Sequence, residues 1–204
     1  MDDKETNWER IARFLFEGSM LKHTWRTGYP FLGKGRESVA AHTFGVILSA
    51  MMLARDVPGV DMEKLLKLCL VHDLPEARTG DANAVHKRYV TIDEKSAITE
   101  MIQGLPGGEE IADLLSEFRD CKTTESVLAH DADQLDMLLS LKEHLDTGSS
   151  DAALWIPYVR DRLKSEGAKA LADAILKEHW ASWWMRQLLG NNAKEREINK
   201  LNKN

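Results

Sequence analysis

The stretch that decides the fold of this 204-residue chain is Leu70-Val71-His72-Asp73-Leu74-Pro75-Glu76-Ala77-Arg78-Thr79-Gly80-Asp81. An apolar run, interrupted by one lysine, leads into the adjacent histidine and aspartate, and a glutamate follows. On a helix, Glu76 lies three residues from Asp73 and four from His72, so these side chains share one edge. Burying an unpaired carboxylate is costly, and a divalent metal removes that cost. The pattern predicts a metal site; the alternative is a helix end whose polar residues are merely solvated.

The composition of the chain indicates one domain with one sizeable core. Hydrophobic residues make up 43% of the sequence, and one domain is the default at this length. The net charge of −6 argues against a partner that is a nucleic acid polymer, because such binders normally carry a basic face. Small anionic substrates fit, since a metal ion and a few Arg or Lys side chains reverse the sign locally.

The cysteines and the length of the apolar runs indicate the cellular compartment of the protein. Cys69 and Cys121 lack CxxC spacing and are interpreted as reduced thiols. The N-terminus has no apolar signal-peptide segment, and the longest apolar run, residues 46–54, is far shorter than a membrane span. We therefore expect a cytoplasmic protein without a membrane partner.

Helical periodicity and capping signals recur along the chain, without an alternating strand pattern, so the expected fold class is all-α. Thr6 and Glu9 have capping-box spacing and predict a helix that ends near Gly18. Asp61 is the expected N-cap of the helix that leads to His72. The first helix is expected to bury Trp8, Ile11, Ala12, Leu15 and Phe16, and later helices are expected at about 37–55, 109–119, 123–147, 152–164 and 169–189.

Further histidines and acids could complete the metal site. His42 lies near the start of the 37–55 helix among small residues, although a lone histidine on a helix is more often structural. In the segment 130–136, Asp131 and Asp133 are about 200° apart on a helix, whereas Asp133 and Asp136 can face one site. An acid directed inward among leucines needs a partner, and the metal held by the first stretch is the best candidate.

The order of His42, the His72-Asp73 pair and an aspartate near residue 133 resembles the HD-domain superfamily of metal-dependent phosphohydrolases. The finer resemblance is to its 5′-deoxynucleotidase branch, with the related HD-domain-containing protein 2 group. It spans about residues 8–145 and is carried by four segments: Leu21–Gly28, Glu37–Thr43, His72–Asp81 and Asp131–Asp136.

The resemblance implies a fold and a set of site residues. The fold would be an HD-domain helical bundle of about seven to nine helices in a single domain over residues 1–189, with C-terminal helices at 151–189. Residues 190–204 are polar and expected to be disordered. One divalent metal, which could be Mn, Co, Ni, Fe, Mg or Zn, would be held by His42, His72, Asp73 and Asp133. Glu76 and Asp81 match the catalytic acids of the branch, and Arg26 and Asp81 would bind the substrate.

The implied reaction is hydrolysis of a (deoxy)nucleoside 5′-monophosphate to nucleoside and phosphate by a homodimer. A tryptophan-rich segment, 180–184, is typical of a core or of a subunit interface. In a bacterial form of the branch, an aromatic residue directly after the arginine helps select the sugar. Here Thr27 follows Arg26, so Trp25 or Tyr29 would have to supply the aromatic side chain that lines the sugar site. Arg26 could instead be a surface residue stacked on Trp25. Other possible functions are hydrolysis of another phosphoester (a cyclic nucleotide, an alarmone or a nucleoside triphosphate) and catalytically silent nucleotide binding.

Overall fold

Helices make up nearly all of the regular structure. The computed structural model describes residues 6–188, which form nine α-helices of seven or more residues and one single-turn helix, α4. The only β-structure in this range is an isolated bridge between Trp25 and Ser38. The all-α prediction is thereby confirmed.

The α-helices, in chain order, are α1 (Asn7–Ser19), α2 (Val39–Leu53), α3 (Met62–Val71), α4 (Glu76–Thr79), α5 (Glu94–Ile102), α6 (Gly108–Asp120), α7 (Thr124–Asp146), α8 (Ala152–Arg162), α9 (Glu166–Lys177) and α10 (Ser182–Leu188). Four short 3-10 helices lie between them: η1 (Met20–Lys22), η2 (Tyr29–Leu32), η3 (Ala54–Asp56) and η4 (His86–Arg88).

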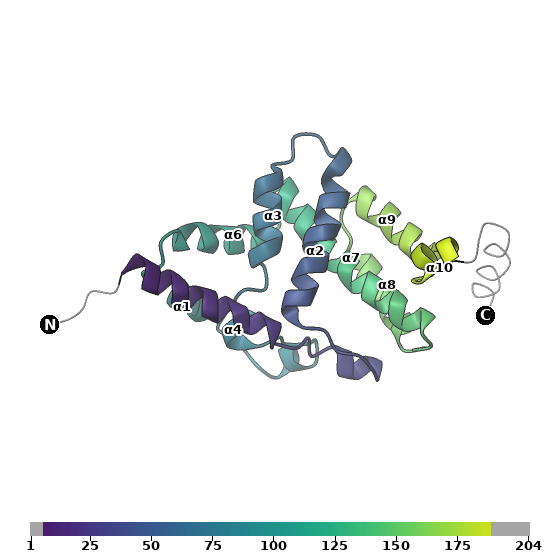
Figure 1. Ribbon diagram of the computed structural model, residues 1–204, viewed down its shortest axis with the longest axis horizontal. Helices are drawn as coiled ribbons and strands as arrows, with labels where there is room; N and C mark the ends of the chain where they lie inside the picture. The colour runs from purple at the N-terminus through teal and green to yellow at the C-terminus, as the bar shows by residue number, and fades with distance from the viewer. Residues whose placement is uncertain (1–5, 189–204) are drawn as a thin grey trace.

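Three helices form the centre of the molecule (Figure 1). The long helix α7 crosses α2, and α3 packs against both of them. Helices α1, α4 and α6 lie on one side of this centre, and α8, α9 and α10 lie on the other. The residues expected at the metal site come from α2, from α7 and from the turn that follows α3.

Two apolar clusters hold these helices together, and α7 belongs to both. The first cluster joins α2 and α3 to the N-terminal half of α7 and includes Val46, Ala50, Leu65, Leu68 and Leu128. The second joins the C-terminal half of α7 to α8 and α9 and includes Leu135, Leu138, Leu141, Val159 and Ala172. The middle of α7, which carries Asp133, therefore lies where the two clusters meet.

The predicted caps are confirmed, but the predicted buried face of the first helix is wrong. Thr6 and Glu9 form a capping box on α1, and Asp61 accepts the N–H of Lys64 at 3.0 Å on α3. In α1, however, Trp8, Leu15 and Phe16 are largely exposed, at 79%, 63% and 77%. The buried residue is Arg10, because its guanidinium donates to the backbone carbonyls of Met101 and Gln103 at the end of α5.

The expected helix 169–189 is two helices, α9 and α10. The backbone of Glu178 is extended (φ −83°, ψ 149°), which ends α9. The N–H of Trp180 then donates to Oδ2 of Asp146 on α7 at 2.9 Å instead of continuing the helix. The contact with Asp146 on α7 therefore interrupts the single helix that was predicted over residues 169–189. Residues 189–204, which include the expected polar tail, lie outside the described residues.

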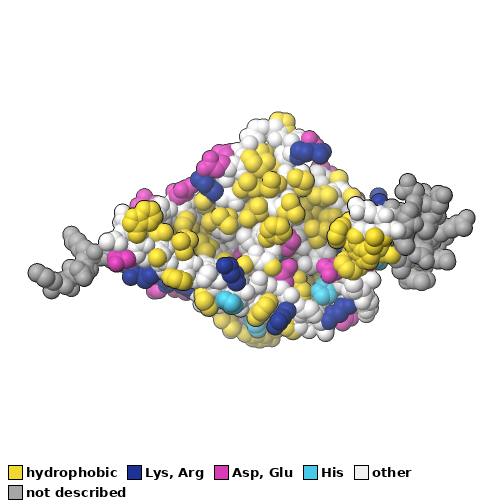
Figure 2. Space-filling view, viewed as in Figure 1, with side chains coloured by type: hydrophobic (Ala, Val, Ile, Leu, Met, Phe, Trp, Pro, Cys, Tyr) yellow, Lys and Arg dark blue, Asp and Glu magenta, His cyan; other side chains and the backbone are white. Residues whose placement is uncertain are grey.

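Exposed apolar side chains gather on the face of α2 that points away from α7 (Figure 2). Phe44, Leu48 and Met52 are 71%, 50% and 56% exposed, and Trp183 on α10 is 72% exposed. A contiguous exposed apolar patch of this kind is typical of an interaction surface. None of the helices in residues 6–188 has the length and apolar character needed to cross a membrane.

Candidate metal centre

The His72-Asp73 pair lies in a turn between α3 and α4, not in one continuous helix as expected. Pro75 has no N–H to donate to the carbonyl of Val71, so that carbonyl accepts the N–H of Leu74 at 2.9 Å instead. The N–H of Glu76 then donates to the carbonyl of Asp73 at 3.0 Å, and α4 begins. The turn leaves His72 and Asp73 directly after α3, and Glu76 follows three residues later as the first residue of α4.

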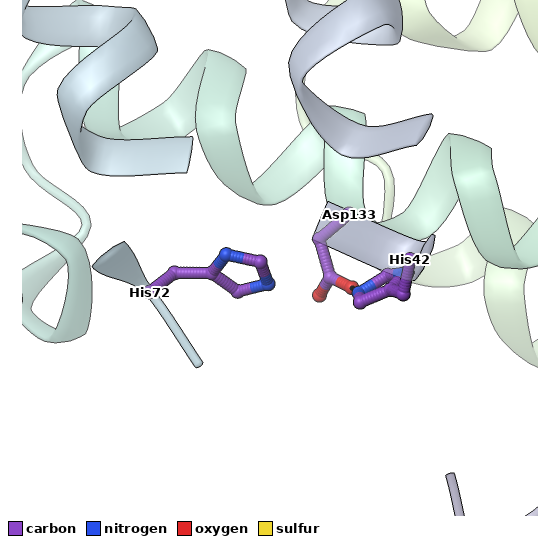
Figure 3. A group of neighbouring side chains, drawn as sticks. All are labelled: His42, His72 and Asp133. Carbon is purple, nitrogen blue, oxygen red and sulfur yellow. Dashed lines mark ion pairs between the residues drawn. The ribbon is translucent and has the colours of Figure 1, made fainter. Parts of the chain in front are cut away.

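Residues far apart in the sequence converge at this turn. Nε2 of His42, on α2, lies 3.1 Å from Oδ1 of Asp133, on α7, and 3.7 Å from Oδ2 of Asp73. Oδ2 of Asp73 is in turn 3.1 Å from Nε2 of His72. Figure 3 shows the His72 ring and the Asp133 carboxylate directed at the same space, with His42 beside them. The structure thus brings together all four residues expected to bind the metal.

Both imidazoles are fixed by a hydrogen bond through the nitrogen that faces away from this space. Nδ1 of His72 lies 2.8 Å from the carbonyl of Cys69, to which it can only donate. Nδ1 of His42 lies 2.6 Å from Oδ2 of Asp136. Each ring therefore directs Nε2 inward, which is the arrangement typical of metal-bound histidines.

The four residues fit a divalent metal. Nε2 of His72 is buried and forms no hydrogen bond, although Oδ2 of Asp73 lies 3.1 Å away; in a neutral imidazole this nitrogen offers its lone pair to a metal. One donor atom each from His42, His72 and Asp133 all lie within 4.8 Å of one another. Donors around a metal at about 2.1 Å are at most about 4.2 Å apart, so only a small inward movement is needed. Two imidazoles and two carboxylates also leave coordination positions for water and substrate.

Asp136 is a contact that sequence reasoning did not assign. Its carboxylate reaches His42 because residue 45, one turn along α2, is a glycine: a Cβ at Gly45 would lie 1.8 Å from Oδ1 of Asp136. The spacing of Asp133 and Asp136 on α7 was the available signal, since it places both acids on one side of the helix. The two acids bind opposite nitrogens of the same imidazole.

Gly45→Ala is expected to weaken metal binding by about 10- to 100-fold, the usual effect of disturbing a residue that orients a metal ligand. The methyl group would displace Asp136 and release the His42 ring. Titration of the metal-stripped variant with Mn²⁺ measures the effect. Gly18→Ala is the matched control, because a Cβ there meets only Leu74 at 3.6 Å. Unchanged Mn²⁺ affinity in Gly45→Ala would contradict the assignment.

The side chain of Arg26 is only 13% exposed and lies within reach of the charges of Asp73 and Asp133, so it is not the surface arginine of the alternative interpretation. The N–H of Arg26 donates to the carbonyl of Glu37 at 2.9 Å, which ties its segment to the start of α2. Its Nε lies 3.8 Å from Glu37, and its Nη1 is buried without a hydrogen-bond partner. The arginine that stacks on Trp25, at 4.6 Å from the ring centre, is Arg36.

The two expected catalytic acids differ in their surroundings. Oε2 of Glu76 is buried without a hydrogen-bond partner. Burial raises the pKa of Glu76, and the charges of Asp73 and Asp81 raise it further, to about 9. Oδ2 of Asp81, in contrast, accepts a hydrogen bond from the hydroxyl of Thr27 at 2.9 Å. Glu76 therefore holds a proton at neutral pH in the metal-free protein.

The residues expected to bind the metal also shift one another's pKa values. Burial lowers the pKa of His42, but its hydrogen bonds to Asp133 and Asp136 outweigh this and raise the pKa to about 9. Burial raises the pKa of Asp133, but its hydrogen bond to His42 and the charge of that ring hold the pKa well below its usual range. The same negative surroundings that favour a proton on His42 would favour a metal cation beside it.

The metal-free protein is expected to lose stability as the pH rises from about 6.5 to about 9. The folded-state pKa values of His42 and Glu76, about 9, exceed their ordinary values of 6.5 and 4.5. The folded chain therefore keeps protons that the unfolded chain releases, and the stabilisation they give is lost as the pH approaches 9. Urea unfolding in a chelator at pH 6.5 and pH 9 measures this. Equal or greater stability at pH 9 would contradict it.

Other residues of interest in the sequence have structural roles. Asp131 accepts the N–H groups of Lys164 and Ser165, at 2.7 and 2.9 Å, and faces away from the site. His130 stacks on Phe118. Tyr29 is 7% exposed and its hydroxyl donates to Ser140 at 3.1 Å, so it cannot form the wall of an open substrate site.

Comparison with known proteins shows the family to which the chain belongs. Residues 19–175 match the family model described as HD domain. The chain is 35% identical over 136 residues to 5′-deoxynucleotidase HDDC2 of Dictyostelium discoideum, covering 61% of this chain and 72% of that protein. It is 31% identical over 144 residues to 5′-deoxynucleotidase hdd1 of Schizosaccharomyces pombe, covering 66% and 72%.

Solved structures share the fold. A protein from Pyrococcus horikoshii has a TM-score of 0.69 and 26% identity, covering 81% of this chain and 98% of that chain. An HD-domain phosphohydrolase of Listeria innocua has a TM-score of 0.60 and 20% identity, covering 95% and 96%; at this identity the likeness concerns the fold alone. From the family match, together with the convergence of His42, His72, Asp73 and Asp133, the chain belongs to the HD-domain family.

Proposed function

We propose that the protein is a metal-dependent 5′-deoxynucleotidase, which hydrolyses deoxynucleoside 5′-monophosphates to nucleoside and phosphate. The observation that carries this proposal is a donor set of two buried histidines, His42 and His72, and two half-buried aspartates, Asp73 and Asp133, with the charge of the Arg26 guanidinium beside it. The names of the relatives from Dictyostelium discoideum and Schizosaccharomyces pombe support the substrate class.

The four donors would hold one divalent ion through Nε2 of each histidine and one oxygen of each aspartate. When bound, such an ion supplies a Lewis acid and lowers the pKa of water toward neutrality. A set of two imidazoles and two carboxylates suits Mn, Co, Ni, Fe, Mg and Zn to different degrees, and we propose no single one.

Arg26 would bind the phosphate. Its Nη1 is a buried donor without a partner, so a phosphate oxygen would satisfy it. A guanidinium presents paired N–H groups that match a phosphate group and oppose the charge that develops during hydrolysis. Glu37 and the charges of Asp73 and Asp133 keep Arg26 cationic, because together they outweigh the effect of burial on its pKa.

Glu76 and Asp81 would handle the protons. Glu76 holds a proton that it can donate to the 5′-oxygen of the leaving nucleoside, and a nearby cation would bring its raised pKa closer to the working pH. Asp81, with Oδ2 held by Thr27, would use its other oxygen to orient the attacking water.

Phosphate release from a panel of compounds, each with Mn²⁺, Co²⁺, Mg²⁺ or no metal, tests the proposal. We expect metal-dependent release from deoxynucleoside 5′-monophosphates and slower release from ribonucleotides. Equal rates for both sugars would make the protein a general 5′-nucleotidase. Hydrolysis of only a cyclic nucleotide, an alarmone or a nucleoside triphosphate would replace the proposed substrate class. No turnover together with tight nucleotide binding would identify a silent binding protein.

We also propose a homodimer in the cytoplasm. The exposed apolar residues Phe44, Leu48 and Met52 on α2 form a patch that a second copy would cover. The thiols of Cys69 and Cys121 are free, which suits a reducing compartment. Sedimentation of the wild-type protein and of a Phe44→Glu variant tests the dimer; a wild-type monomer would contradict it.

A further inference from the structure

Thr27 ties the segment that carries Arg26 to the loop that carries Asp81. The backbone N–H and the hydroxyl of Thr27 both donate to Oδ2 of Asp81, the hydroxyl at 2.9 Å. Oγ1 of Thr27 also accepts the backbone N–H of Asn83 at 3.1 Å, and Nδ2 of Asn83 donates to the Thr27 carbonyl at 3.2 Å. Thr27, Asp81 and Asn83 therefore form one closed set of hydrogen bonds, here termed the Thr27 cluster.

The loop that carries Asp81 has no regular structure of its own to fix it. Gly80 ends α4 with φ 70° and ψ 162°, a conformation that is accessible essentially only to glycine. Residues 81–83, which follow, lie in neither helix nor strand. The position of the Asp81 carboxylate therefore depends on side-chain contacts, and the two bonds from Thr27 are charge-assisted and correspondingly strong.

The segment that contains Thr27 is also hydrogen-bonded to the start of α2, the helix that carries His42. Arg26, the neighbour of Thr27, is bonded through the backbone to Glu37, and the N–H of Val39, the first residue of α2, donates to the carbonyl of Thr24 at 2.9 Å. His42 lies one turn further along α2. The segment 24–27 therefore links three parts of the site: the helix of one metal ligand, the arginine and the acid.

We propose that Thr27 is a positioning residue for hydrolysis, which fixes the Asp81 carboxylate relative to Arg26 and Glu76. The inference rests on the proposed function, because it assigns Asp81 a part in that reaction. Both hydrogen bonds go to Oδ2, so the other oxygen of Asp81 stays free to act on water. Because position 27 is a threonine whose hydroxyl is bonded to Asp81, it would not supply an aromatic wall for the sugar.

Steady-state kinetics of Thr27→Val, Thr27→Ser, Asp81→Asn and the double variant Thr27→Val/Asp81→Asn test this. Valine keeps the size of threonine and the backbone bond but removes the hydroxyl. We expect Thr27→Val to lower kcat by about 10-fold or more, as expected for losing a hydrogen bond to a charged group, with KM and metal content unchanged. Thr27→Ser should restore kcat. The double variant should be no slower than Asp81→Asn alone, because Thr27 acts through Asp81.

Hydrogen exchange of the Asn83 amide gives a second measurement that does not depend on turnover. Thr27→Val should speed its exchange, and Thr27→Ser should not. The control is Thr24→Val, in the same segment, whose hydroxyl donates to Met20 and not to Asp81. Wild-type kcat in Thr27→Val, or losses that multiply in the double variant, would overturn the inference. If the wild-type protein hydrolyses no nucleotide, the proposed function fails, and Asn83 exchange alone decides whether Thr27 holds the loop: faster exchange supports this and unchanged exchange overturns it.

Discussion

Asp73→Ala is expected to abolish metal retention and phosphate release together. Oδ2 of Asp73 lies 3.1 Å from Nε2 of His72 and 3.7 Å from Nε2 of His42, so its loss opens the donor set at its centre. Even residues that only orient metal ligands are worth about 10- to 100-fold in affinity, so the loss of a ligand should exceed about 100-fold. Metal content after dialysis and the rate of phosphate release measure both effects.

The matched control for Asp73→Ala is Asp113→Ala, which removes an exposed aspartate on α6. This control should keep its metal and its rate. The helices should also persist in Asp73→Ala, because Asp73 lies in the turn after α3 and belongs to neither apolar cluster. An Asp73→Ala protein with wild-type turnover would contradict the assignment of the metal centre.

Glu76→Gln is expected to keep the metal and lose turnover, by about 100- to 10,000-fold in kcat, the usual contribution of a general acid or base. The amide has nearly the same size as the carboxyl group but cannot deliver a proton. Oε2 of Glu76 has no hydrogen-bond partner, and Glu76 is not one of the three residues (His42, His72 and Asp133) whose donor atoms lie within 4.8 Å of one another, so metal binding should not need its charge. Metal titration and kcat, measured on the same preparation, separate the two properties.

The control for Glu76→Gln is Glu109→Gln, an exposed glutamate in the first turn of α6. The variant should also flatten the loss of stability between pH 6.5 and pH 9, since Glu76 no longer titrates. A variant that turns over at the wild-type rate would remove Glu76 from the proposed mechanism. Loss of the metal would make Glu76 a ligand instead.

The local parts of the fold could be predicted from the sequence because they depend on neighbouring residues. The caps at Thr6 and Asp61 each need only a side chain and an N–H three residues away. Asp133 and Asp136 lie on one side of α7 and Asp131 on another, which follows from the rotation per residue of an α-helix alone. These predictions needed no knowledge of how the helices pack.

What could not be predicted depends on contacts between distant segments. The apolar pattern of α1 suggested Trp8 and Phe16 as core, but the carbonyls at the end of α5 are satisfied by Arg10, and this places the other side of α1 in solvent. The break between α9 and α10 follows from Asp146 on α7. The close approach at Gly45 likewise appears only when α2 and α7 are packed together.

The sequence pointed to the four residues that the structure brings together, but not to the residues that hold them in place. His42, His72, Asp73 and Asp133 were expected from a resemblance to a family, and their convergence is what the structure adds. The hydrogen bond from Thr27 to Asp81 joins a loop to a turn more than fifty residues away. No periodicity or spacing marks such a contact, because neither partner lies in a regular element.

The most direct test of the account is phosphate release from deoxyadenosine 5′-monophosphate by metal-stripped protein as Mn²⁺ or Co²⁺ is added. We predict no release without metal, and a rate that rises and saturates at one ion per chain. The same titration of Asp73→Ala should stay flat. A rate that is the same with and without metal, in protein shown to be metal-free, would contradict the central claim that these four residues hold a catalytic metal.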